Sequence, residues 1–204
     1  MTTLPSRIWQ AIRSIHVGPI TSSSAELAKL WQAAESRSGV AVNEASALSY
    51  SAVWAAVALI ASDVASLPLV LYRRTGERSR ARYVDHPLYE LLHDAPNPEM
   101  TSLVFRETLQ AHVLTWGNGY AEIQRDGAGR PVALWPLSPD RVTVERVGRE
   151  LVYRYPSATP GRPDVILPAS DVLHVPGLGY DGLVGYSVIR QARESIGLGL
   201  ATER

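Results

Sequence analysis

The chain of 204 residues contains no cysteine. This absence excludes disulfide bonds, cysteine-ligated zinc, iron–sulfur clusters and thiol catalysis. Any excess of one charge is also missing, because 20 basic residues balance 20 acidic ones. Neutrality argues against a basic protein that coats nucleic acid, but it permits weak contact with DNA that must slide. A chain of this length can bury enough surface to fold without disulfides or metals.

A long uninterrupted hydrophobic run is missing as well. Residues 1–15 have no apolar core of signal-peptide length. Residues 47–72 are mostly apolar, but Asp63 and Pro68 interrupt them, whereas a membrane-spanning helix needs about 20 apolar residues without a central carboxylate. The apolar spacing instead predicts an amphipathic helix over residues 50–66, which Pro68 ends. Its expected apolar face consists of Val53, Val57, Ile60, Val64 and Leu67.

Helical patterns dominate the first part of the chain. Ser23 and Glu26 have capping-box spacing and predict a helix over residues 23–36, within a flexible N-terminal arm of residues 1–46. A domain of residues 47–204 is expected to follow. After the helix at 50–66, its predicted elements are a strand at 69–72, a short helix at 87–93 with Pro87 in its first turn, and a long helix capped by Thr101 that ends at 117–119.

From residue 120 onward the apolar period changes to two, which is typical of strands. Two pairs of short strands flank glycine-containing turns at 126–129 and 148–149 and predict two hairpins. Helices followed by antiparallel strands and hairpins define an α+β fold. The predicted strands are 120–125, 132–135, 142–147, 151–155, 165–167 and 172–175, and a final helix capped by Ser187 is predicted to run to residue 201.

One motif imitates a nucleotide-binding loop. Gly177, Gly179 and Gly182 spell G-x-G-x-x-G after a predicted strand, and Glu203 follows about 20 residues later. In dinucleotide-binding folds the helix begins at the glycines, so that its N-terminus faces the pyrophosphate. Here the predicted helix begins several residues later, at Ser187. This delay favours a glycine turn and leaves a dinucleotide-binding enzyme fragment as the weaker alternative.

The histidines and acids do not predict a catalytic or metal centre. Asp171 and His174 lie three residues apart on a strand and therefore point to opposite faces. His112 lies on a predicted helix, where a packed, hydrogen-bonded imidazole is the more frequent role. Ser187 lacks the closing glycine of a G-x-S-x-G elbow. We therefore expect no catalytic residue, metal or cofactor at any of the five histidines, which are His16, His86, His93, His112 and His174.

The one concentrated charge in the sequence is basic. Five arginines lie within ten residues and are offset only by Glu77. Such a run after a strand favours a solvated hairpin tip, and the alternative is a surface that faces phosphates or a protein partner. Three tryptophans are expected in the core rather than as stacking platforms for bases. The arginines are Arg73, Arg74, Arg78, Arg80 and Arg82, and the tryptophans are Trp54, Trp116 and Trp135.

Several short motifs occur in order between residues 39 and 200. They are GVAVN at 39–43, ASLPL at 65–69, DHPLYELL at 85–92, PNPEMT at 96–101, WGNGYAE at 116–122, LWPLSPDRV at 134–142, DVLH at 171–174, Asp181-Gly182, and Gly185-Tyr186-Ser187. In this order and spacing they resemble the portal proteins of tailed bacteriophages, in the Hong Kong-type siphophage group. Val188 stands where members of that family usually have proline.

The resemblance implies a virion structural protein and not an enzyme. The chain would form the wing-like N-terminal part of a portal subunit, with the stem, clip and crown regions absent. Portal subunits form a ring of twelve at one capsid vertex, through which double-stranded DNA is packaged and ejected. Their partners are the terminase large subunit, the capsid or scaffold protein and the head–tail connector, and assembly takes place in the bacterial cytoplasm without a membrane.

Without the stem and clip, we expect the 204-residue chain to be monomeric or heterogeneous in solution. Two further alternatives stay open at the level of sequence. One is a free-standing oligomeric adaptor, and the other is a prophage remnant. The sequence alone also leaves open whether the arginines at 73–82 contact DNA.

Overall fold

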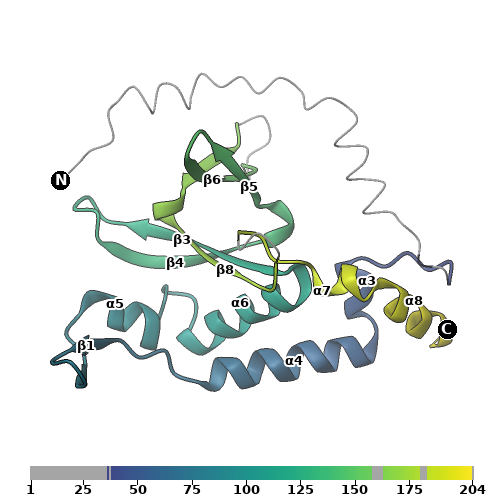
Figure 1. The fold of residues 1–204 in the computed structure, drawn as a ribbon, viewed down its shortest axis with the longest axis horizontal. Coiled ribbons are helices and arrows are strands. Elements are labelled where there is room, and N and C mark those ends of the chain that lie inside the picture. The colour runs from purple at the N-terminus through teal and green to yellow at the C-terminus, as the bar shows by residue number, and fades with distance from the viewer. Residues whose placement is uncertain (1–35, 37, 158–162, 180–182, 204) are drawn as a thin grey trace.

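The computed structural model describes residues 36, 38–157, 163–179 and 183–203 (Figure 1). It is layered, with α4 on the outside, α6 beside it, a central sheet over α6 and a second sheet beyond (Figure 1). The predicted α+β order is confirmed, because helices come first and antiparallel strands follow. The helix predicted at 23–36 lies almost wholly outside the described residues.

The helical elements differ widely in length, and the two long ones, α4 and α6, lie side by side. No helix within the described residues combines the length and apolarity needed to span a membrane. The helices are α3 (Glu44–Leu48), α4 (Ser51–Ser66), α5 (Pro87–Tyr89), the π-helix η1 (Glu90–Asp94), α6 (Ser102–Trp116), the 3-10 helices η2 (Pro139–Arg141) and η3 (Ala169–Asp171), α7 (Val188–Gln191) and α8 (Arg193–Thr202).

The strands of the described residues form three antiparallel sheets, with the orders β1-β2, β4-β3-β8 and β5-β6-β7. Both predicted hairpins are confirmed, as β3–β4 and β5–β6. Gly129 and Gly148 take positive φ angles of 79° and 63° in their turns, a conformation that glycine adopts without steric cost. The strands are β1 (Tyr72–Arg74), β2 (Arg80–Arg82), β3 (Asn118–Arg125), β4 (Pro131–Leu137), β5 (Thr143–Val147), β6 (Glu150–Tyr155), β7 (Val165–Pro168) and β8 (Val172–Pro176).

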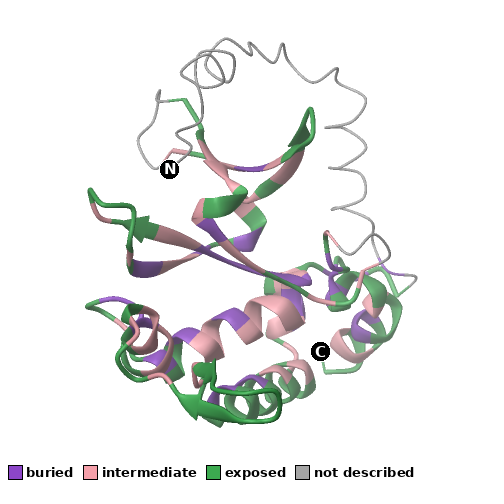
Figure 2. Cartoon of the chain, turned by 60° about the vertical axis from the view of Figure 1, so that its left-hand side comes forward, coloured by how far each residue is buried: buried purple, intermediate pink, exposed green. Residues whose placement is uncertain are grey.

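The core consists of three apolar clusters that join neighbouring layers. One lies between α6 and the central sheet, and it contains Phe105 and Leu109 of α6. A second joins the two larger sheets, and a third joins α3 to α7 and α8 (Figure 2). The buried members are Phe105, Leu109, Ala121 and Leu134 in the first cluster; Tyr120, Leu137, Tyr153 and Val172 in the second; and Val42, Ala47, Ile189 and Ile196 in the third.

The buried face of α4 differs from the predicted one. Val53 and Val57 are half-buried as expected, but the deepest burial continues at Ala61 and Ala65, which are 1% and 0% exposed. Alanine lets the two long helices approach closely, and the Arg106 guanidinium donates two hydrogen bonds to the Ala65 carbonyl oxygen, at 2.8 and 3.1 Å. Three residues of the predicted face, Ile60, Val64 and Leu67, remain 44%, 42% and 67% exposed.

Three other predictions need correction. The strand expected at 69–72 begins only at Tyr72, because its pairing with β2 involves the residues after Leu71. The final helix breaks at Ala192 into α7 and α8. Trp54 is 60% exposed instead of buried, and Trp116 and Trp135 are half-buried.

The described part of the predicted arm packs against the domain. Val40 and Val42 are 8% and 4% exposed, and Asn43 caps α3 by accepting a 2.8 Å hydrogen bond from the Ser46 N–H. The packed chain therefore begins before residue 46.

Candidate functional site

Three of the chain's sequence motifs meet where α6, β3, β8 and the segment before α7 come together. α6 ends at Gly117, whose φ of 82° is the left-handed conformation that terminates many helices, and β3 begins at the next residue. β3 pairs with β8, which places Tyr120 opposite His174. We call this region the motif junction, and it consists of Thr115, Gly117, Asn118, His174, Gly177, Gly185 and Ser187.

Glycine is required in the motif junction because main chains touch there. A Cβ atom on Gly185 would collide with the Gly117 carbonyl oxygen, and one on Gly117 would collide with the Tyr186 carbonyl oxygen. The Gly177 N–H donates a 2.8 Å hydrogen bond to the Gly117 carbonyl oxygen. The backbone after α6 thus packs directly against the backbone at residues 177 and 185–186, too closely for a side chain at these positions.

Asn118 holds the junction together with its side chain, which is buried. Its Oδ1 accepts from the Gly185 N–H at 2.8 Å and lies 3.0 Å from His174 Nε2, and its Nδ2 donates to the Gly185 carbonyl oxygen at 3.0 Å. Because Oδ1 can only accept, His174 must carry its proton on Nε2. His174 Nδ1 then accepts from the Tyr153 hydroxyl at 3.1 Å.

This hydrogen-bond chain requires a neutral imidazole at His174. Burial lowers the pKa of His174 from 6.5 to about 4, which keeps the ring uncharged near neutral pH. Tyr120 stacks on the ring with a centroid separation of 4.5 Å, and burial raises the pKa of Tyr120. The aromatic and polar groups of the junction therefore stay uncharged at neutral pH.

Ser187 closes the other side of the junction. Its hydroxyl donates to the Thr115 carbonyl oxygen at 2.8 Å and caps α7 by accepting from the Arg190 N–H at 3.2 Å. Arg190 also reaches Glu44 at 3.2 Å and thereby ties α7 to α3. These contacts of the motif residues tie the end of α6 to α7 and α3.

The two described glycines of the G-x-G-x-x-G motif, Gly177 and Gly179, lie against the backbone of other residues of the chain. The N–H of Gly177 already donates to Gly117, and a Cβ at Gly179 would collide with the Val184 carbonyl oxygen. The next helix, α7, has four residues and begins only at Val188. Gly182 lies outside the described residues. Gly177 and Gly179 therefore serve close backbone packing.

The described histidines occupy four separate places. His86 caps α5 by accepting from the Leu88 N–H at 3.1 Å, and His93 lies 2.8 Å from Asp94 and stacks on Tyr89. Asp171 pairs with Arg125 at 3.0 Å instead of with His174. His16 lies outside the described residues. Across the part of the chain that the structure describes, no group of three or more histidine and acidic side chains is placed to hold a metal ion.

His112 departs from the prediction of a fully hydrogen-bonded imidazole. Its ring meets Trp116 edge-on at 5.7 Å, and its buried Nδ1 has no hydrogen-bond partner among the described residues. Burial lowers the pKa of His112, and the charge of Asp140 opposes this shift. The ring is therefore a packed, neutral group.

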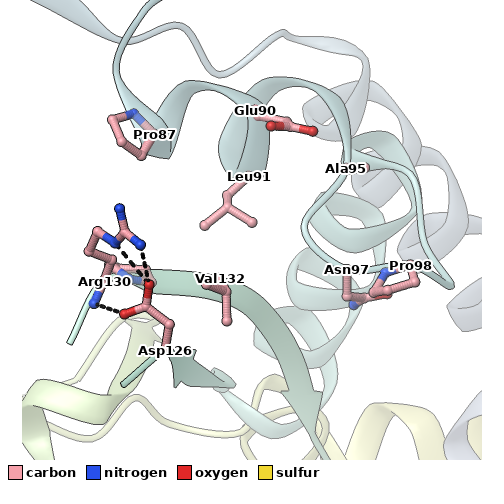
Figure 3. A pocket seen from close by; sticks show the side chains of 10 residues that line it. Pro87, Glu90, Leu91, Ala95, Asn97, Pro98, Asp126, Arg130 and Val132 are labelled. Carbon is pink, nitrogen blue, oxygen red and sulfur yellow. Dashed lines mark hydrogen bonds and ion pairs between the residues drawn. The ribbon is translucent and has the colours of Figure 1, made fainter. Parts of the chain in front are cut away.

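An open cleft of about 470 Å³ separates the α5–η1 segment from the β3–β4 hairpin (Figure 3). Pro87 and Leu91 form one wall, and Val132 lies on the other. Arg130 and Asp126 pair with each other at 2.8 Å, and hydrogen bonding by the Arg130 N–H lowers the pKa of Asp126. The cleft thus combines apolar side chains with the Asp126–Arg130 ion pair, and the polar residues Glu90 and Asn97 also line it.

Two surfaces contrast with these internally satisfied regions. The arginines at 73–82 lie on the exposed β1–β2 hairpin, far along the molecule from the C-terminal end of the chain (Figure 1). Ile60 and Val64 of α4 and its C-cap residue Leu67 follow each other at helical spacing and remain exposed. We call these three residues the outer ridge of α4.

The fold and the motif junction define a structural module whose motif residues pack closely against each other. Comparison with known proteins agrees with this class. Residues 51–204 match the family model described as phage portal protein. The chain is 35% identical over 164 residues to the portal protein of Enterobacteria phage HK97, and 33% identical over 179 residues to the probable portal protein of Streptomyces phage phiC31.

Solved structures show the same architecture. The chain resembles a protein in the neck of an empty gene transfer agent (GTA) particle, computed with C6 symmetry, with a TM-score of 0.62 and 26% identity over 82% of this chain and 43% of that one. A protein of a native GTA neck computed with C12 symmetry shares the fold, with a TM-score of 0.56 and 22% identity over 74% of this chain and 39% of that one.

The chain belongs to the phage portal protein family. The resemblance predicted from the ordered motifs is thereby confirmed. The matched stretches cover 79% and 82% of this chain but 38% of each of the two curated relatives. The chain therefore spans about two fifths of the length of those proteins.

Proposed function

We propose that this protein is the N-terminal, wing-like part of a portal subunit and acts by assembly at the portal vertex of a virion. The observation that carries the proposal is the role of the family motifs, whose residues Gly117, Asn118, Gly185 and Ser187 contact each other inside the chain. Motif residues that pack against each other are expected in a structural protein, which needs a defined shape to assemble with other copies. In this proposal the chain itself catalyses no reaction.

The proposed partners follow from the family. They are further copies of the chain in a ring of twelve, double-stranded DNA in the channel, the terminase large subunit, the capsid or scaffold protein and the head–tail connector. The C6 symmetry of the related neck supports a rotationally symmetric arrangement. Assembly would take place in the cytoplasm of the bacterial host.

Immunogold labelling of purified particles tests this proposal. An antibody against the described domain is expected to mark one vertex per particle, where the tail joins the head. Label spread over the capsid surface, or particles that lack the chain, would contradict it. A vertex that contains this chain beside a separate full-length portal polypeptide would instead identify a free-standing adaptor.

The outer ridge of α4 is the surface that we assign to a neighbouring copy in this ring. Leu67 is 67% exposed, and together with Ile60 and Val64 it extends an apolar stripe beyond the area that α6 covers. A rotationally symmetric ring places a neighbour beside every subunit, and exposed apolar patches commonly mark such contacts.

A charge placed on the ridge should block this contact. We expect Leu67→Glu to reduce incorporation of the chain into particles by about tenfold, because a buried unpaired carboxylate is costly. Ser62→Glu is the matched control, since Ser62 is exposed on the same helix but on the side away from the ridge. Quantitative mass spectrometry of purified particles measures both variants. Equal incorporation of the Leu67→Glu and Ser62→Glu variants would show that the outer ridge of α4 does not contact a neighbouring copy.

The dinucleotide-binding alternative has a separate test. If Gly177 and Gly179 bound a dinucleotide, millimolar ligand would raise the melting temperature of the chain. We expect no shift, because the glycines are occupied by contacts with Gly117 and Val184.

A further inference from the structure

The β1–β2 hairpin concentrates positive charge on one face. Register pairs Tyr72 with Arg82 and Arg74 with Arg80, and paired or alternate residues of a two-stranded ribbon point to the same side. Arg73 lies on the opposite side, where its guanidinium sits over the Tyr83 ring at 5.0 Å. We call Tyr72, Arg74, Arg80 and Arg82 the arginine face, and all four residues are exposed.

This arrangement is unfavourable in the isolated chain. Arg74 and Arg80 stand directly opposite each other, and like charges in that position repel. Within the described residues, no ion pair involves any of the five hairpin arginines. A bound anion between the side chains would relieve the repulsion.

Other arginines of the chain behave differently. Arg125, Arg130 and Arg154 each pair with a carboxylate at 3.0 Å or less. The chain as a whole has no net charge, so the residues outside the hairpin are net negative. The hairpin therefore concentrates five arginines without an ion pair to the described residues, in a chain that is not short of acids.

The geometry of the arginine face suits a phosphodiester backbone. Arg80 and Arg82 are two residues apart on one strand, which places them about 6.6 Å apart in a line. That separation resembles the spacing of consecutive phosphates along one DNA strand. Guanidinium groups bind phosphate oxygens in a bidentate way, and a tyrosine hydroxyl can also donate to them. A two-stranded antiparallel ribbon is narrow enough to enter the major groove.

We propose that the β1–β2 hairpin binds the phosphate backbone of double-stranded DNA through the arginine face. Several carboxylates that a second copy could offer are already paired, as Asp126, Glu145 and Asp171 show. The inference deepens the proposed function, since it assigns a contact to the DNA that a portal conducts.

Fluorescence anisotropy with a labelled duplex of random sequence tests the inference on the purified 204-residue chain. At about 50 mM salt we expect Arg80→Glu with Arg82→Glu to weaken DNA binding by about tenfold. The slope of log affinity against log salt concentration should become shallower by about two, because two phosphate contacts are lost. Both residues are exposed, so an unchanged melting temperature would show that the fold is intact.

The matched control is Arg146→Glu with Arg149→Glu. These arginines lie at the exposed end of the β5–β6 hairpin, so the control changes the net charge by the same amount elsewhere on the molecule. We expect it to alter DNA affinity by less than about twofold, because screening limits distant charges. Equal losses in the two variants would overturn the inference, as would hairpin-dependent binding of polyglutamate with no binding of DNA.

Particle labelling separates this inference from the proposed function. If the Arg80→Glu, Arg82→Glu chain stays at the vertex while DNA affinity falls, both stand. If the unchanged chain is at the vertex but has no affinity for DNA, only the hairpin inference fails. If the chain is missing from particles, the proposed function fails, whatever the affinity measurement shows.

Discussion

α4 and α6 are neighbouring helices of 16 and 15 residues, yet they bury different kinds of apolar side chain. α6 directs Phe105 and Leu109 into the core, at 5% and 6% exposure. α4 buries alanines against α6 and leaves larger side chains such as Leu59 and Leu67 in solvent, at 64% and 67% exposure. α6 lies between two layers, whereas α4 has a layer on one side only (Figure 1). The difference indicates that α6 stabilises this chain and that α4 is available to a partner.

The largest expected difference between the helices is in stability. We expect Phe105→Ala to lower the free energy of unfolding by about 4 kcal/mol, because it removes a buried ring and leaves a cavity. Leu67→Ala on α4 should change it by less than about 0.5 kcal/mol, because that side chain is mostly hydrated. Urea unfolding followed by circular dichroism measures both. Similar losses for the two variants would mean that the outer ridge of α4 belongs to the core of the chain.

The motif junction at the end of α6 should be almost as sensitive as the core. We expect Gly185→Ala to cost about 3 kcal/mol, since the added methyl group collides with the Gly117 carbonyl oxygen. Gly127→Ala is the matched control in the β3–β4 turn, where a Cβ would meet nothing within 4 Å. Thermal unfolding of the two variants compares them. An unchanged melting temperature of the Gly185→Ala protein would show that the motif junction has room for a side chain at residue 185.

Lowering the pH should have a smaller effect on the stability of the folded chain. The pKa of His174 is lowered in the folded chain to about 4, so the unfolded chain binds a proton at higher pH than the folded one. Stability should therefore fall as the pH drops from about 6.5 towards about 4. His174→Gln should reduce this dependence, and the part that remains would include His112, whose pKa is also lowered. A variant that retains the full dependence would exclude His174 as its source.

The sequence predicted most elements because their local signals are strong. Thr101 caps α6 and Gly117 ends it, and the two hairpin turns lie where glycine-containing turns were expected. The buried side of α4 was misjudged because periodicity counts large apolar residues, whereas close helix packing selected Ala61 and Ala65. Which part of an apolar stripe is covered depends on the neighbouring layer, and a single helix sequence does not contain that information.

The motif junction was predictable in part. The glycines and Ser187 stood out in the sequence, and a glycine turn was favoured over a phosphate loop at Gly177 and Gly179, but the backbone that they pack against was not predicted. The packing of Gly177 against Gly117 depends on the pairing of β3 with β8, which brings together residues fifty or more positions apart. Asn118 was missed as a functional residue, although an asparagine between two glycines directly after a helix is a signal for a special backbone contact.

Electron cryomicroscopy of the vertex in purified particles addresses the proposed assembly most directly. We expect density for the described domain, repeated around a central channel, with the outer ridge of α4 against the adjacent copy. Particles whose vertex contains no density for this fold, or that carry the chain as isolated copies without a ring, would contradict the assignment of this protein as part of a portal.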